Sequence, residues 1–453
     1  MALESINPTT GELLEKFDEW SPARTRETLA AVDLAWLGWR QTSFAERSAR
    51  MRRAAEVLRR NKDEYARTMA LEMGKPIAGG RAEAEKCAWV CDYYAENAEA
   101  MLADEPAQSD GSRAYVAFRP MGTILAVMPW NFPFWQVFRF AAPALMAGNT
   151  GVLKHSSNVP RCALAIEDVF RQAGFPENVF RTLMIGARQV EAVIGNELVK
   201  AVTLTGSDSA GRKVAAKAGE MLKKTVLELG GSDPFLVLAD ADPEQSARIG
   251  AKARCINSGQ SCIAAKRFIV ETVAYDSWLD RFRAAMAALV VGDPLDDQTQ
   301  VGPQAREDLL LELHGQVETS IAKGAKVLLG GQPLERQGYF YPPTILTEVK
   351  PGMPAYHEEF FGPVASVIRV RDAEEAVEVA NATPFGLGGS VWTRDTAKGE
   401  AIAARLEAGT VFVNGMVKSD PRLPFGGVKI SGYGRELSHY GIKEFVNIQT
   451  VWV

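Results

Sequence analysis

Hydrophobic and polar positions follow a helical rhythm in the first hundred residues and a mixed rhythm of strands and helices after that. The opening INPTTGELLEKF places turn residues between two short apolar runs, which predicts a hairpin. Ser21 and Pro22 are typical of a helix start, and apolar residues recur behind them at helical spacing. A second helix is expected from about Phe44 to Met73, with Gly74 and Pro76 ending it.

Cys87 and Cys91 lie four positions apart in AEKCAWVCDYY. This spacing fits a redox or metal-binding pair, and it also fits one apolar face of a helix. The periodicity of the surrounding residues favours the apolar face.

From about residue 121, short β-rich runs alternate with helical stretches. The first runs are GTILAVMP, TGVLKH, VFRTLMIG and AVTLTGS, and the later ones are PFLVLAD, RFIVE, KVLLGG, PVASVIRV, GSVWT and GTVFVN. Strands that alternate with helices at this pitch predict βαβ units and parallel sheets. We therefore expect an α/β fold of two tandem units, with a seam near Gly230 and Gly231.

Two further β-prone segments suggest a small projecting sheet. These are the terminal FVNIQTVWV and the run at residues 115–118. An apolar terminal strand is usually paired or covered, so we expect this sheet to pair with another subunit. The alternative is that both strands pair within one chain.

Composition narrows the possible functions. The chain has 453 residues, 47% of them hydrophobic, and a formal net charge of −5, so it can bury a large core but has no basic excess for nucleic acid. The first residues lack an apolar leader, and no run of 18 apolar residues occurs, so we expect neither a secretory signal nor a membrane span. Five scattered cysteines predict reduced thiols and a cytoplasmic location, and four histidines disfavour a metal site.

Familiar nucleotide motifs are absent or altered. The fingerprint G-x-G-x-x-G does not occur, and GSDSAGRK at 206–213 departs from a phosphate loop at its last two positions. This segment still places Gly206 and Ser207 after a strand and before a helix. Free backbone N–H groups there would point toward an anion.

Three residues could carry covalent chemistry. Cys262 lies among small residues in NSGQSCIAA, which suits an attacking thiolate, although it could equally be a small buried apolar side chain. Glu228 in LELGG could activate a water or simply be solvated. The Asn131 amide in MPWNFP could stabilise an oxyanion or cap a turn.

The motifs PWNFP, LELGGSDP, GQSC, EEFFGP and PFGGVKISGYGRE occur in this order along the chain. This ordered set resembles the NAD(P)-dependent aldehyde dehydrogenase superfamily over essentially the whole chain. The resemblance implies that Cys262 is the nucleophile, Glu228 the general base and Asn131 the oxyanion donor.

The resemblance also implies a domain plan. It has a Rossmann-like cofactor domain over residues 1–104 and 121–230, a catalytic α/β domain over 231–431, and a small β oligomerisation arm over 105–120 and 432–453. A homodimer or homotetramer is then expected.

The cofactor site is likewise implied by motif match. Lys154 resembles the lysine that binds the adenosine ribose, Gly206 and Ser207 the pyrophosphate contact, and Glu359 and Phe361 the residues that hold the nicotinamide ribose and ring. The neighbouring residues of these motifs complete the expected set: Trp130, Asn131, His155, Ser156 and Leu229.

Cofactor choice is expected to depend on Ser157. Members of the family that prefer NAD often carry Glu at this match, whereas Ser is neutral and can donate to a 2′-phosphate. Lys154 and His155 would add positive or potentially positive character. We therefore expect NADP to be preferred, with NAD possible.

Within the family, the chain is most similar to succinate-semialdehyde dehydrogenases. Arg139 matches the arginine that binds the distal carboxylate there, and Ser419 the serine that assists it. A second arginine of that group is replaced by Ile256. Trp135 and Phe425 would supply apolar walls or belong to the core, and a surface ion pair is the alternative for Arg139.

The expected function is therefore oxidation of succinate semialdehyde to succinate through a cysteine thiohemiacetal and thioester. One alternative is a broad-specificity aldehyde dehydrogenase acting on glutarate semialdehyde or medium-chain aldehydes. Two others are a cofactor-free cysteine thioester hydrolase and a binding protein on a retired enzyme scaffold.

Overall fold

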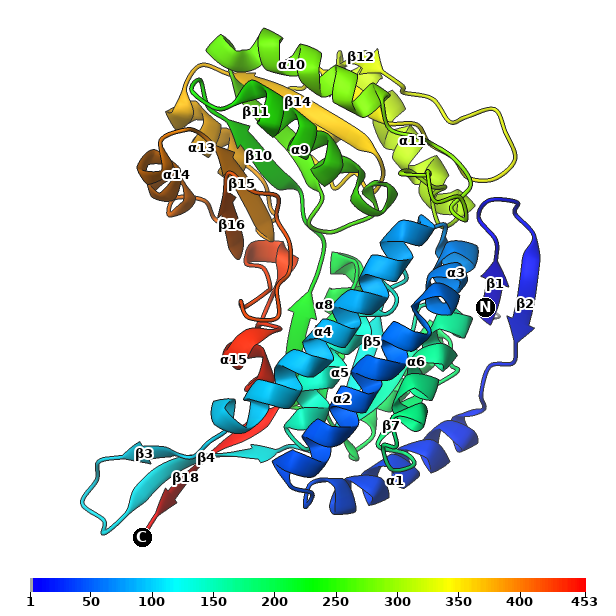
Figure 1. The fold of residues 1–453 in the computed structure, drawn as a ribbon, viewed down its shortest axis with the longest axis vertical. Helices are drawn as coiled ribbons and strands as arrows, with labels where there is room; N and C mark the ends of the chain where they lie inside the picture. The colour runs from blue at the N-terminus through cyan, green and yellow to red at the C-terminus, as the bar shows by residue number, and fades with distance from the viewer. Residues whose placement is uncertain (1–2) are drawn as a thin grey trace.

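Two mainly parallel β-sheets lie one above the other along the long axis of the molecule, and helices cover both (Figure 1). The structure is a computed structural model that describes residues 3–453. It confirms the α/β class expected from the alternation of strands and helices.

The first sheet has six strands in the order β17-β9-β8-β5-β6-β7. Successive strands run outward from β5 on one side and from β8 on the other, so the strand order reverses between them. Ligands of such sheets bind beyond the carboxyl ends of the strands at this reversal. The strands are β5 (Thr123–Met128), β6 (Thr150–His155), β7 (Phe180–Thr182), β8 (Val199–Thr205), β9 (Lys224–Glu228) and β17 (Gly432–Tyr433).

Helices close both faces of this sheet with separate apolar clusters. One face packs against α5 and α6, with α2, α3 and α4 outside them, and the other face packs against α1, α7 and α8. The helices are α1 (Pro22–Trp39), α2 (Phe44–Arg60), α3 (Lys62–Met73), α4 (Ile77–Met101), α5 (Trp135–Met146), α6 (Pro160–Gln172), α7 (Val190–Gly195) and α8 (Asp208–Glu220).

The second sheet has seven strands in the order β12-β13-β14-β11-β10-β15-β16, of which only the pair β12 and β13 is antiparallel within the described residues. The chain enters it directly from the first sheet, between Glu228 and Asp233. Its strands are β10 (Asp233–Val237), β11 (Ala265–Glu271), β12 (Lys326–Leu329), β13 (Thr344–Thr347), β14 (Val364–Val370), β15 (Gly388–Trp392) and β16 (Thr410–Val413).

Helices also cover both faces of the second sheet. Aromatic residues Trp278 and Phe282 of α10 stack on one face, beside α9. The helices are α9 (Pro243–Cys255), α10 (Thr272–Ala287), α11 (Glu307–Ala322), α12 (Pro354–His357), α13 (Ala373–Asn381) and α14 (Thr396–Ala403).

The N-terminal elements follow the sequence pattern with one correction. Strands β1 (Leu3–Ile6) and β2 (Leu13–Phe17) form the expected hairpin, and Ser21 caps α1 by accepting a hydrogen bond from the Arg24 N–H. The expected single helix from Phe44 to Met73 is wrong, because the chain leaves helical geometry at Asn61. Asn is a poor helix former, and the break lets α2 and α3 pack on α4 separately.

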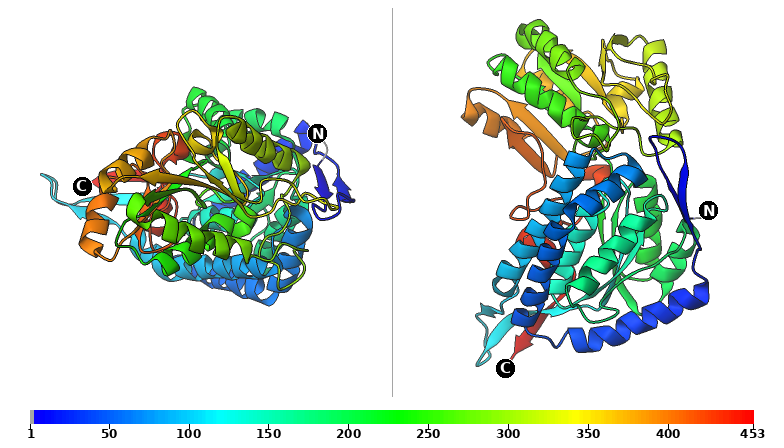
Figure 2. Two further views of the ribbon diagram at one scale, coloured as in Figure 1. Left: turned by 90° about the horizontal axis from the view of Figure 1, so that it is seen from above. Right: turned by 45° about the vertical axis from the view of Figure 1, so that its right-hand side comes forward.

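A slender three-stranded sheet projects from the body, at the lower left of Figure 1. It consists of β3 (Glu105–Ala107), β4 (Ala114–Pro120) and β18 (Val446–Trp452), and β18 follows the short helix α15 (Ser438–Ile442). Strands β4 and β18 pair antiparallel within the chain, as the alternative interpretation expected. Seen from above, this sheet and the N-terminal hairpin lie on opposite sides of the molecule (Figure 2, left).

Among residues 3–453, no helix has both the length and the apolarity that a membrane crossing needs. Cys87 and Cys91 lie on the buried face of α4, and burial raises the pKa of both thiols well above the ordinary value. This arrangement agrees with the apolar-face interpretation of their spacing.

Candidate active site

The three candidate catalytic residues meet where the two sheets face one another. Asn131 follows the carboxyl end of β5, Glu228 ends β9, and Cys262 comes just before the amino end of β11. The carboxyl edge of the first sheet therefore faces the amino edge of the second. The site lies beside the reversal between β5 and β8, where such a fold binds ligands.

Cys262 lies where two cavities meet. A cavity of about 460 Å³ is lined by Asn131, Ser207 and Phe361. A second cavity of about 850 Å³ is lined by Trp135, Arg139 and other residues of α4, α5 and α9. Cys262 lines both cavities, so its sulfur can be reached from either side.

The Cys262 thiol is directed toward Glu228, with 3.9 Å between Sγ and Oε2. Burial raises the pKa of this thiol well above its ordinary value, and the neighbouring Glu228 carboxylate raises it further. Burial also raises the pKa of Glu228. The raised pKa of Glu228 makes this carboxylate a better proton acceptor than one exposed to water.

Asn131 is fixed by hydrogen bonds on both sides of its amide. Its Nδ2 donates to the Gln260 carbonyl at 3.1 Å, and its Oδ1 accepts from Gln136 Nε2 at 3.0 Å. The amide orientation is therefore set, and Nδ2 keeps one hydrogen for a ligand. Because Asn131 and Cys262 line the same cavity, that hydrogen can serve an oxyanion formed there.

A strained loop carries the cysteine. Asn257 and Ser258 both adopt left-handed backbone conformations, with φ of 52° and 58°. The Asn257 side chain donates to the Asn131 carbonyl at 2.7 Å and to the Gln260 carbonyl at 3.1 Å. These bonds tie the cysteine loop to the asparagine loop, which compensates for the strained backbone.

Lys266 binds backbone carbonyls of the same loop. Its ammonium donates to the carbonyls of Ser261 at 3.0 Å and Cys262 at 2.8 Å. It also pairs with Glu359 at 3.2 Å, and the same Glu359 oxygen accepts from the Gly231 N–H at 3.0 Å. Glu359 therefore joins the segments before β10, β11 and β14.

The start of α5, which follows Asn131, is anchored by a buried ion pair. Glu83 accepts hydrogen bonds from the N–H groups of Phe134 and Trp135, both at 2.9 Å. Lys75 neutralises the other Glu83 oxygen at 2.7 Å. A carboxylate at a helix N-terminus satisfies N–H groups that have no partner within the helix.

Arg139 is buried, with 2% of its side chain exposed, so the surface ion pair considered for it is wrong. Its guanidinium contacts Glu228 at 3.0 Å and Glu436 at 2.5 Å, and it donates to Thr205 at 3.2 Å. Burial raises the pKa of Glu436 to about 7. Arg139 does line the larger cavity, as expected, but its charge is already shared by two carboxylates.

The other residues expected to contact substrate line the same cavity. Trp135, Ser419 and Phe425 all face it, as does Ile256. The Ser419 hydroxyl accepts a hydrogen bond from Lys86 at 2.7 Å. Trp135 and Phe425 are also buried within the core cluster of the first unit, so both earlier interpretations apply to them.

Several residues expected to contact the cofactor line the smaller cavity. These are Trp130, Asn131, Gly206, Ser207, Leu229, Glu359 and Phe361. Trp130 and Phe361 meet edge to face, with ring centroids 5.7 Å apart. The Gly206 N–H donates to the Glu228 carbonyl at 3.0 Å, so it is not one of the free donors expected from the sequence.

Residues 154–157 lie at the carboxyl end of β6 and outside the lining of that cavity. Burial lowers the pKa of His155 to about 4, and its ring is bound between the Pro133 carbonyl and the Ser156 N–H. The positive charge expected at His155 is therefore wrong. Ser156 donates to Asn158, and Ser157 follows it at the turn before α6.

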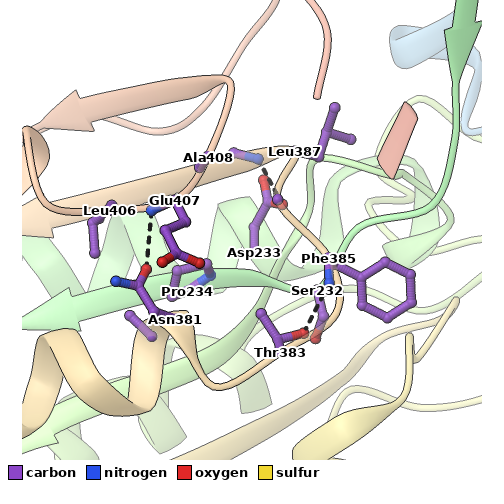
Figure 3. A pocket seen from close by; sticks show the side chains of 13 residues that line it. Ser232, Asp233, Pro234, Asn381, Thr383, Phe385, Leu387, Leu406, Glu407 and Ala408 are labelled. Atoms are coloured by element: carbon purple, nitrogen blue, oxygen red, sulfur yellow. Dashed lines mark hydrogen bonds between the residues drawn. The ribbon is translucent and has the colours of Figure 1, made fainter. Parts of the chain in front are cut away.

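A third crevice, of about 10 Å³, lies on the second unit beside Asp233 (Figure 3). Two of its polar side chains are bound within the crevice: Asp233 accepts from the Gly388 N–H and Asn381 accepts from the Glu407 N–H. It has room for about one water molecule, so it is not a ligand site.

Sequence reasoning missed four residues that complete the centre. They are Gln136, which orients Asn131, Glu436, which shares Arg139, Lys266, which holds the cysteine loop, and Lys86 in the larger cavity. Glu436 ends the motif PFGGVKISGYGRE, and the other three lie outside the quoted motifs. Their roles are revealed by the side-chain contacts that the fold creates.

Comparison with known proteins agrees with this geometry. Residues 1–451 match the aldehyde dehydrogenase family. A protein of Synechocystis named "Probable succinate-semialdehyde dehydrogenase [NADP(+)]" is 51% identical over the full length of both chains. "Succinate-semialdehyde dehydrogenase [NADP(+)] 1" of Mycobacterium tuberculosis strain H37Rv is 52% identical, also over the full length of both.

A solved structure shows the same fold. The succinic semialdehyde dehydrogenase of Streptococcus pyogenes, in complex with NADP+, superposes with a TM-score of 0.97 over 99% of each chain and is 38% identical.

Replacing Gly259 should disrupt the cysteine loop. Gly259 has φ of +78°, and a Cβ there would lie 2.2 Å from the carbonyl carbon of Gly362. We expect Gly259→Ala to lower the free energy of unfolding by about 2–4 kcal/mol through strain and overpacking, as measured by denaturant unfolding. Gly315→Ala, on α11 with open space around it, is the control and should not destabilise. Equal stability of the Gly259→Ala variant and the parent would show that the loop has room for a Cβ at this position.

Alkylation of Cys262 should report its raised pKa. Only the thiolate reacts with iodoacetamide, so the rate should rise about tenfold per pH unit until the pKa is passed. We expect no plateau up to pH 9 in the cofactor-free protein, measured by mass spectrometry of the labelled peptide. Cys262→Ser is the control for labelling elsewhere. A plateau below pH 8 would show that the thiol is not perturbed as described.

Proposed function

This chain belongs to the aldehyde dehydrogenase family, and we propose that it oxidises succinate semialdehyde to succinate with NADP+ as the hydride acceptor. The observation that supports this most directly is the position of Cys262. It lies between two cavities. The smaller one is beside the start of α8, and the larger one is lined by positively charged and aromatic side chains. The curated relatives with about half of their residues identical carry the same activity in their names.

The reaction begins with proton loss from the Cys262 thiol. The proton leaves to water in the cavities that Cys262 lines, and Glu228 stays ionised for the later hydrolysis step. The thiolate forms a carbon–sulfur bond with the aldehyde carbon, and the aldehyde oxygen becomes an oxyanion. The free hydrogen of Asn131 Nδ2 stabilises that oxygen, held in place by Gln136 and Gln260.

The smaller cavity fits a dinucleotide. The start of α8 at Ser207 offers N–H groups to a pyrophosphate, and Trp130 and Phe361 form apolar walls near Cys262. A nicotinamide held there by Trp130 and Phe361 would supply the hydride acceptor, and loss of hydride from the substrate carbon would leave a thioester on Cys262. A neutral Ser157 beside Lys154 is compatible with a 2′-phosphate.

Glu228 is placed to hydrolyse the thioester. Its Oε1 makes no hydrogen bond to residues 3–453, so it can accept one from water. Its raised pKa makes it a stronger base than an exposed carboxylate. Water adds to the thioester carbon as its proton passes to Glu228, and the Cys262 thiolate leaves with release of the acid.

A cofactor-free thioester hydrolase is the rival from another class. Such enzymes activate cysteine with histidine. His155 is bound away from the sulfur, and His357 of the smaller cavity accepts from the Gly352 N–H at 2.9 Å. The site favours the dehydrogenase.

The projecting sheet supports a further part of the proposal, a homo-oligomer. Strand β18 presents Ile448 and Trp452, which are 62% and 60% exposed. An exposed apolar strand is normally covered by a partner. A second copy of this chain would cover it.

Replacing the base should separate the two chemical steps. With Glu228→Gln we expect a burst of about one NADPH per site, followed by a steady-state rate lower by at least ~100-fold, because the thioester forms but water is not activated. Stopped-flow absorbance at 340 nm follows this. Cys262→Ala should give no burst while still binding NADP+. A steady-state rate equal to that of the parent would reject the role of Glu228.

Cofactor preference should respond to Ser157. In Ser157→Glu we expect the NADP/NAD ratio of kcat/KM to fall at least tenfold, because a carboxylate repels the 2′-phosphate. Ser157→Ala removes only the hydroxyl and should change the ratio less. If the Glu variant kept the parental ratio, cofactor choice would be set elsewhere.

A further inference from the structure

The larger cavity contains a lysine that the proposed chemistry does not use. Lys86 lies on α4, one helical turn after Glu83, and faces the cavity together with Trp135 and Ser419. Its ammonium lies 4.1 Å from the centre of the Trp135 ring and donates to Ser419 Oγ at 2.7 Å. The side chain is half-buried, so its position is set by the cavity wall.

Within the part of the chain that the structure describes, no carboxylate forms an ion pair with Lys86. The acidic side chains that act on it are Glu83, which is bound to Lys75, and Asp420, which is bound to Arg422. Among the charged groups, Arg139, which is also positive, acts most strongly on the pKa of Lys86 and lowers it. A cation placed in a cavity beside a like charge requires an anion to compensate it.

Arg139 cannot fill the same need, because Glu228 and Glu436 already share its guanidinium. An anion that drew Arg139 away from Glu228 would also break the ion pair that stabilises the general base. The second arginine expected for carboxylate recognition is replaced by Ile256, which lines the same cavity. The recognition of a distal carboxylate therefore falls to another cation.

We propose that Lys86 and Ser419 together form the receptor for the distal carboxylate of the substrate. Lys86 keeps two N–H donors after its bond to Ser419. Ser419 accepts from Lys86, so its own hydrogen is free to be donated. Three donors can therefore converge on one carboxylate, while Trp135 and Phe425 contact the carbon chain between it and Cys262. This inference rests on the proposed function, because it assigns a receptor to the acidic end of that substrate.

The test compares two aldehydes of equal length. Succinate semialdehyde carries the carboxylate, and butanal carries a methyl group in its place. Values of kcat/KM are measured with NADP+ for the parent, Lys86→Met, Lys86→Arg and Lys252→Met. Lys252 is an exposed lysine on the same cavity, so its variant controls for loss of one charge.

We expect Lys86→Met to lose 10- to 100-fold on succinate semialdehyde, as a charge-assisted hydrogen bond implies, and less than threefold on butanal. Lys86→Arg should recover most of the loss, and Lys252→Met should change the ratio of kcat/KM for the two aldehydes by less than threefold. If the parent prefers succinate semialdehyde and Lys86→Met keeps that preference, the inference is overturned and the proposed function stands. If the parent shows no preference, both fall.

A second measurement needs no variant that could misfold. Succinate should inhibit butanal oxidation by occupying the same receptor. Burial and the charge of Arg139 lower the pKa of Lys86 to about 8, while Arg139 stays charged and the Cys87 thiol beside Lys86 stays neutral. Above that pKa the ammonium loses its proton, so binding of succinate should weaken.

We expect the inhibition constant of succinate to rise at least tenfold between pH 7.5 and 9.5 in the parent, and to stay constant in Lys86→Arg. Glu83 is paired with Lys75, the hydrogen bonds from Arg422 lower the pKa of Asp420, and Glu436, with a pKa of about 7, is mostly ionised at the start of this range. A constant value in the parent would assign the carboxylate to Arg139 and overturn the inference.

Discussion

The buried contact of Arg139 with two carboxylates is the constraint on which the catalytic centre depends. It joins Glu228 at the end of β9, which contacts the cysteine, to Glu436 near the C-terminus. Burying one carboxylate without a cation would cost several kcal/mol. Burial raises the pKa of both carboxylates, and the charge of Arg139 opposes this shift, so that Glu228 can still act as a base.

This contact also determines how positive charge is divided within the site. Arg139 serves the catalytic glutamate, Lys266 holds the backbone of the cysteine loop, and Lys75 neutralises the glutamate that anchors α5. Each of these cations compensates a group of the protein itself. Lys86 differs from them, because among residues 3–453 its only hydrogen-bond partner is the hydroxyl of Ser419, and this is why ligand recognition is assigned to it.

The arrangement of the two sheets explains why such a centre can be both rigid and accessible. Loops from the carboxyl edge of the first sheet and the amino edge of the second bind one another through Asn257 and Glu359. The strained backbone at Asn257 and Ser258 is tolerated because these bonds over-determine it. Contacts with both units thereby hold the cysteine between the two cavities.

The sequence by itself determined the α/β class, the hairpin, most strands and the identity of Cys262, Glu228 and Asn131 as a candidate set. Hydrophobic periodicity and ordered motifs are local properties, and they survive without knowledge of the fold. Three features depended instead on packing between distant segments. They are the break between helices at Asn61, the neutral state of His155, and the hydrogen bond that the Gly206 N–H donates to Glu228. Only the tertiary structure decided which charges meet: Arg139 and Lys86 look equally available in the chain, but burial beside two carboxylates occupies one of them and leaves the other facing the cavity.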